Sequence, residues 1–65
     1  MSIGLNIRAL REQAGLTQKE LAEKVFVTQV LLCQVERGSK ACSLPLALEI
    51  AKALNCTIND IVKQE

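Results

Sequence analysis

Apolar residues recur along the chain at helical spacing, in five segments separated by capping and turn residues. No segment alternates apolar and polar positions as a strand would, so the pattern predicts an all-α fold. The first helix is expected from about Ile3 to Ala14, with a stripe toward the core formed by Ile3, Ile7, Leu10 and Ala14. Gly15 follows, where a left-handed residue commonly ends a helix.

Two further helices are predicted between about residues 18 and 37. Thr17 and Glu20 have the spacing of a capping box, which opens the first of them. After a short turn, Thr28 is a favourable N-cap for the next helix, expected at Gln29 to Arg37 and ended by Gly38. The residues of this region expected to face the core are Leu21, Ala22, Val25, Val27, Leu32 and Val35.

The last third of the chain predicts two more helices. Ser43 caps the first, and Pro45 falls in its first turn, where a missing N–H is tolerated. Asn55 is suited to end that helix, and Thr57 opens a short final helix with Asp60 three residues later. The residues expected to face the core here are Leu44, Ala47, Ile50, Ala51, Leu54, Ile58, Ile61 and Val62.

The composition limits the size and nature of the core. A chain of 65 residues buries only about 60% of its unfolded surface. Phe26 is the only aromatic residue, so the core must be built from Leu, Ile, Val and Ala. The formal net charge of +1 argues against strong non-specific binding to nucleic acid, although a local basic patch is compatible with it. We expect residues 1–65 to form a single domain, because no repeat or linker divides them.

The cysteines and the absence of histidine narrow the chemistry. Cys33, Cys42 and Cys56 are odd in number and have no paired spacing, which favours reduced thiols in the cytoplasm over a disulfide framework. With no His and no C-x-x-C motif, we expect no metal site and no cofactor. The chain also has no phosphate-binding glycine loop and no room for a ligand pocket, so we expect no small-molecule ligand and no enzyme activity. Neither a signal peptide nor a membrane span is expected. Met1 and the polar end at residues 63–65 fit a complete small protein or a domain of a longer one.

The segment TQKELAEKVFVTQVLLCQVERG meets the requirements of a helix-turn-helix. Ala22 is small where the two helices would cross, and Val27 anchors the turn. With its flanking segments IRALREQAG and LALEIAKALN, the chain resembles the Cro/CI-type (XRE) helix-turn-helix family of phage and bacterial repressors over about residues 3–62. The resemblance implies a compact five-helix, lambda-repressor-like domain that binds double-stranded DNA as a homodimer. Its third helix would lie in the major groove of an inverted-repeat operator.

The resemblance also implies roles for individual residues. Gln18 matches a residue that holds a backbone phosphate, and Gln29 and Gln34 match positions that contact base edges. Arg11 and Glu36 match an internal salt bridge, while Arg8 is a further candidate for a phosphate contact. The residues expected to contact DNA are Arg11, Gln18, Lys19, Thr28, Gln29, Val30, Leu31, Cys33, Gln34 and Lys40.

The chain departs from the family pattern in three places. Phe26 stands where the turn usually has Gly, and a bulky residue is strained there if φ is positive. Val30, Leu31 and Cys33 make the third helix unusually apolar, with no obvious place for them inside. Cys42 replaces a usual Pro.

Several alternatives therefore stay open. Val30 can pack on a thymine methyl group, or Val30, Leu31 and Cys33 can form a protein-binding patch. The second interpretation would make the chain a protein-interaction module of the antitoxin or anti-repressor type. Cys33 is either a spectator or a redox-sensitive thiol, and Gln18 and Lys40 are either phosphate contacts or ordinary surface residues.

Overall fold

The computed structural model describes residues 2–63 as five α-helices, and no strand occurs within that range. The helices are α1 (Ile3–Gln13), α2 (Gln18–Lys24), α3 (Gln29–Arg37), α4 (Leu44–Ala53) and α5 (Ile58–Val62). The all-α prediction is thus confirmed. Met1 and residues 64–65, which bear on whether the chain is complete, lie outside the described residues.

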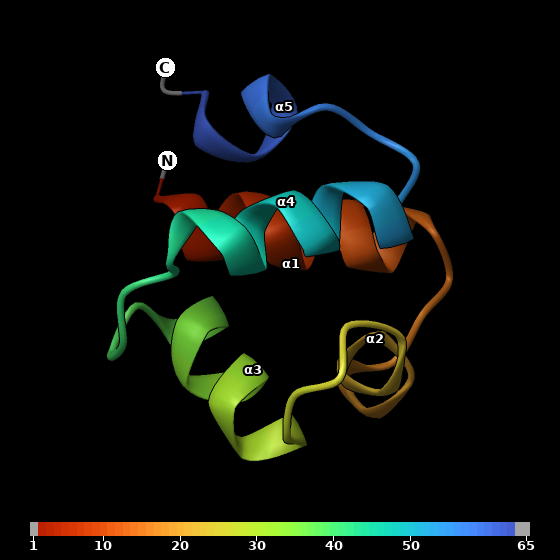
Figure 1. Cartoon of the computed structure of the whole chain (residues 1–65), viewed down its shortest axis with the longest axis vertical. Helices are drawn as coiled ribbons and strands as arrows, with labels where there is room; N and C mark the ends of the chain where they lie inside the picture. The colour runs from red at the N-terminus through yellow and green to blue at the C-terminus, as the bar shows by residue number, and fades with distance from the viewer. Residues whose placement is uncertain (1, 64–65) are drawn as a thin grey trace.

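The helices form two groups in space. In Figure 1, α2 and α3 lie together at one end of the molecule, while α5 lies at the other. Contacts join α1 to both α3 and α5, and α4 to both α2 and α5. Helices α1 and α4 therefore connect the α2–α3 unit to the end of the chain. None of the five helices is both long and apolar enough to cross a membrane.

Capping residues set the helix boundaries, as the sequence predicts. In the Thr17 box, the Glu20 amide donates to the threonine hydroxyl at 3.1 Å, and the Thr17 amide donates to the Glu20 carboxylate at 2.8 Å. Thr57 and Asp60 form a second box at the start of α5. Gly15 and Gly38 adopt positive φ angles of 75° and 81°, so both end their helices as expected.

A continuous apolar core joins all five helices. Its fully buried large side chains are Ile7, Leu21, Leu32, Ile50 and Ile61. The smaller buried residues that complete it are Ala22, Val25, Val35 and Ala51. Val27 in the turn packs against this core while staying half-buried. The predicted inner faces of α2 and α3 are confirmed.

The predicted burial is wrong for five residues. Four that were expected to face the core are exposed, and one that was expected to face outward is half-buried. Ile3 and Ala14 are exposed because α1 instead turns Gly4, Asn6, Ile7 and Arg11 inward. Leu44 is 64% exposed and Val62 is 39% exposed, since each lies at an end of its helix, beyond the buried stripe. Leu31, expected to have no place inside, is half-buried against the core.

The inward turn of α1 is explained by what its residues contact. A Cβ atom on Gly4 would lie 2.7 Å from the Glu36 carbonyl oxygen and closer still to that of Val35, so only glycine allows this approach to α3. The Asn6 amide donates to the carbonyl oxygens of Ile61 and Lys63, both at 2.8 Å. These two hydrogen bonds satisfy carbonyl groups at the end of α5 that the helix itself leaves free.

Candidate nucleic-acid interface

Helices α2 and α3 are joined by a tight turn that depends on an unusual residue. Phe26 has a φ of 60° and is 94% exposed. A left-handed backbone at a bulky residue costs roughly 1–2 kcal/mol. The strain foreseen for a non-glycine residue in this turn is therefore present. It is offset by Val27, whose amide donates to Ala22 at 3.1 Å while its side chain packs on the core.

The turn places the outer face of α3 beside the start of α2. Leu32 and Val35 hold the inner face of α3 in the core, so the opposite stripe faces outward. This stripe lines a shallow hollow of about 280 Å³ together with the side chain of Gln18. We call it the α3 stripe, and it consists of Gln29, Val30, Cys33, Gln34 and Arg37.

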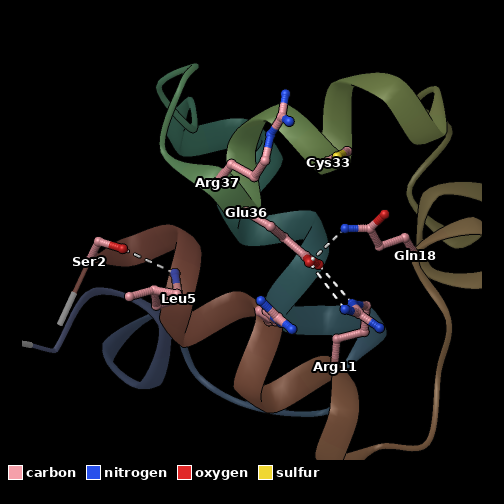
Figure 2. A pocket seen from close by; sticks show the side chains of 8 residues that line it. Ser2, Leu5, Arg11, Gln18, Cys33, Glu36 and Arg37 are labelled. Carbon is pink, nitrogen blue, oxygen red and sulfur yellow. Dashed lines mark hydrogen bonds and ion pairs between the residues drawn. The ribbon is translucent and has the colours of Figure 1, made fainter.

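A second hollow, of about 400 Å³, continues the first toward the start of α1 (Figure 2). The two hollows share Gln18, Cys33 and Arg37. The second adds Ser2 and Leu5 at the start of α1, Arg8 one turn later, and the Arg11–Glu36 pair. The hollows together make one concave surface that runs from the N-terminal end of α3 to the first turn of α1.

A buried hydrogen-bond network lies beside this surface. Glu36 is 3% exposed, and its carboxylate accepts from Arg11 Nε at 2.8 Å and from Arg11 Nη2 at 3.2 Å. Gln18 Nε2 donates to the same carboxylate at 3.0 Å, as the dashed lines in Figure 2 show. Arg11 Nη1 also donates to the Leu16 carbonyl oxygen at 2.8 Å. The network ties α1, α2 and the end of α3 together, and it confirms the predicted Arg11–Glu36 salt bridge.

The network fixes the state of both Arg11 and Gln18. Hydrogen bonding to Glu36 raises the pKa of the Arg11 guanidinium, so Arg11 stays charged. A carboxylate only accepts, so the Gln18 amide turns its nitrogen toward Glu36 and its oxygen away. Gln18 is thus neither free nor simply solvent-facing, and its oxygen and second N–H are left for the hollows.

The remaining residues expected at the site lie in several different places. Thr28 caps α3 by accepting from the Leu31 amide at 3.1 Å, which leaves the Gln29 and Val30 amides at the helix start without intrahelical acceptors. Lys19 is exposed on α2. Arg11 lines the second hollow, but its guanidinium group is held by the ion pair with Glu36. Leu31 packs against the core and lines neither hollow. Lys40 is exposed and lines a separate hollow beside Gly38 and the start of α1.

The structure adds Arg37, which the sequence reasoning did not select. It lies in the last turn of α3 and lines both hollows. In the part of the chain described, ion pairs join Arg11 to Glu36 and Arg8 to Glu12, and Arg37 takes part in neither. Its position eight residues after Gln29 on the same helical face was the available signal.

The charge of this surface is locally positive despite the small net charge. Arg8, Arg11 and Arg37 line it, against one carboxylate, that of Glu36. Arg8 reaches Glu12 only at 3.5 Å, and both side chains are more than half exposed. The surface therefore offers amides that donate and accept, an exposed valine and guanidinium groups, a combination that suits a polyanion with hydrogen-bonding groups in a groove.

The three cysteines are free thiols in this structure. Burial raises the pKa of Cys42 and of Cys56, which disfavours the thiolate form of both. Only Cys33, half-buried on the α3 stripe, belongs to the site. Within residues 2–63, no group of three or more His, Cys, Asp or Glu residues is arranged to hold a metal ion.

Comparisons with known proteins agree with this geometry. A helix-turn-helix family model matches residues 7–61. The chain is 50% identical over 48 residues to an uncharacterized HTH-type transcriptional regulator of Methanothermobacter thermautotrophicus, covering 74% of this chain and 70% of that protein. It is 35% identical over 65 residues to the immunity repressor protein of Bacillus phage phi105, covering all of this chain but 45% of the repressor.

A solved structure extends the likeness to the whole fold. The P22 c2 repressor, crystallised in complex with a synthetic operator, superposes with a TM-score of 0.89 at 29% identity. The match covers 100% of this chain and 98% of that one. The five-helix, lambda-repressor-like architecture expected from the sequence is thereby confirmed.

Proposed function

The chain belongs to the helix-turn-helix family, and we propose from this and from the α3 stripe that it is a transcriptional regulator, more specifically a repressor, that binds double-stranded DNA. The observation that carries the proposal is the concave surface of Gln18 and the α3 stripe, held in place by the buried Arg11–Glu36 pair. Relatives and structural neighbours described as transcriptional regulators and repressors support it.

In the proposed complex, α3 enters the major groove. Gln29 and Gln34 contact base edges, because an amide donates and accepts as adenine recognition requires. Arg37, Arg8, Lys19 and Lys40 contact phosphates around the groove. Gln18 contributes its second N–H to a phosphate while Glu36 holds the first. Arg11 acts from inside, as a positioning residue, since its ion pair leaves it 8% exposed.

We propose that two copies bind an inverted repeat, with their third helices about 34 Å apart. Few residues of each subunit contact phosphates, so a monomer alone would bind weakly. The exposed leucines of α4 are suited to the contact between subunits, because Leu44 is 64% and Leu48 is 44% exposed. Ile61 on α5 is less suited, since it is fully buried in the core. Sedimentation of the protein with and without DNA tests this, and Leu48→Asp should leave a monomer.

The proposed regulator acts in the cytoplasm, as one domain over residues 1–65, without enzyme activity or a cofactor. Selection of bound sequences from random duplex DNA, at low and then physiological salt, tests its central claim. An inverted repeat with fixed half-site spacing would establish a dimeric operator-binding regulator. Recovery of no sequence even at low salt would contradict it and favour the protein-interaction module, with exposed Val30 and Phe26 as the surface to probe.

A further inference from the structure

Two of the three apolar residues that make α3 unusual face the same hollow. Val30 is 67% exposed, and Cys33, one turn later, is half-buried. Both line the hollow of the α3 stripe, between the amides of Gln29 and Gln34. Leu31, in contrast, packs against the core. The apolar part of the outer face is therefore a small, defined patch made of Val30 and Cys33.

The chemistry around this patch limits what it can recognise on DNA. In the major groove, thymine alone among the four standard bases presents a methyl group, and apolar side chains contact it. Guanine is read mainly by Arg or Lys, and residues 29–35 contain neither. Gln29 and Gln34 flank the patch with amides, which match adenine. Arg37 is the only cation of the stripe, and it lies in the last turn.

We propose that Val30 and Cys33 are specificity-determining residues that read the C5 methyl groups of two thymines in an A·T-rich half-site. The inference rests on the proposed DNA-binding function and names the bases that it reads. Residues three apart on a helix have Cβ atoms about 5–6 Å apart. Because base pairs follow each other at about 3.4 Å, the two thymines lie one or two base steps apart. Contact with the methyl groups also removes the exposed Val30 side chain from water.

Replacement of thymine by deoxyuridine tests the proposal, because uracil lacks only the C5 methyl group. The probes are duplexes of the selected operator in which single thymines are changed, and binding is measured with the intact protein. At two positions in each half-site, uracil should weaken binding about three- to fivefold, the factor that corresponds to one buried carbon. Val30→Ala should bind thymine and uracil equally at one of these positions, and Cys33→Ser at the other. Gln29→Ala, the matched control, should still distinguish them at both.

The outcomes separate this inference from the function on which it rests. Equal binding to operators with and without uracil, with preference over random DNA intact, would overturn the methyl reading and leave the regulator standing. Discrimination that survives both Val30→Ala and Cys33→Ser would also overturn it, because other residues would then contact the methyl groups. If selection recovers no operator, the proposed function fails first and this inference with it.

Discussion

Arg11 and Glu36 form a buried ion pair in which two guanidinium nitrogens meet one carboxylate, with Nε 2.8 Å from Oε2. The same carboxylate holds Gln18 at the start of α2. The orientation of a side chain on the candidate DNA surface thus depends on a pair that also joins α1 to α3. Stability and recognition are coupled at this point of the fold.

Removal of one partner of this pair should be severe. Arg11→Met leaves the Glu36 carboxylate buried without its cation, which is expected to lower the free energy of unfolding by about 3–5 kcal/mol. Denaturant unfolding measures the change. The double variant Arg11→Met/Glu36→Leu should be more stable than Arg11→Met, since no charge is then stranded. Arg8→Gln breaks the exposed pair with Glu12 and should cost at most about 1 kcal/mol. An equally small effect of Arg11→Met would contradict the argument.

Replacement of Phe26, which has a positive φ angle, should stabilise the folded protein. Asparagine tolerates a left-handed backbone better than phenylalanine, and the phenyl ring is 94% exposed, so its removal loses little burial. Phe26→Asn should therefore raise the free energy of unfolding by about 0.5–1 kcal/mol. Asn55, with a φ of 55°, is the matched control, because Asn55→Phe should lower it by a similar amount. If Phe26→Asn destabilises the protein, the ring contributes contacts beyond those of an exposed side chain.

Much of the fold could be predicted because its signals are local. Thr17, Thr28, Ser43 and Thr57 begin their helices through hydrogen bonds within one turn, so sequence spacing is enough to find them. The 3.6-residue period likewise placed Leu32 and Val35 inside. These features need no knowledge of the other helices.

The incorrect predictions concern positions whose burial depends on contacts between segments far apart in the sequence. The helical period predicted Ile3 on the inner face of α1. The close approach of Gly4 to α3 and the hydrogen bonds from Asn6 to the end of α5 instead turn a different face of α1 inward. The site shows the same division. Thr28 at its N-cap was foreseen, whereas the position of Arg37 in the second hollow depends on how α1 packs against α3.

The two capping boxes predict a loss of stability in acid. Hydrogen bonds from the Thr17 amide and hydroxyl lower the pKa of Glu20 from its ordinary value of 4.5, and those from Thr57 lower the pKa of Asp60 from 3.8. A carboxylate whose pKa is lowered by folding stabilises the protein above its ordinary pKa and loses that effect as pH falls through the folded value. The thermal unfolding midpoint should therefore decrease as the pH is lowered below about 4.5. The variant Glu20→Gln/Asp60→Asn should show a shallower fall, and an unchanged pH profile would contradict the role of the boxes.

The base-reading role proposed for the α3 amides can be separated from general affinity. Gln29→Ala and Gln34→Ala should each weaken binding to the selected operator by about 1–3 kcal/mol and barely change binding to random DNA. Titrations of both duplexes at one salt concentration measure this difference. Gln13→Ala, an exposed glutamine on α1, is the control and should change neither. Equal losses on operator and random DNA would show that the two amides do not read sequence.

Replacement of Arg37 should change the salt dependence of DNA binding and not its sequence preference. A side chain that neutralises one phosphate contributes about 0.9 to the slope of log K against log salt concentration. Arg37→Gln should lower that slope by about 0.9 and weaken operator and random DNA alike. Lys52→Gln, in a hollow formed by α2 and α4 and not by α3, should leave the slope unchanged. An unchanged slope for Arg37→Gln, with weaker binding to the operator alone, would mean that Arg37 contacts a base. In that case a guanine should appear at the end of the half-site, because guanine is the base that arginine reads with two hydrogen bonds.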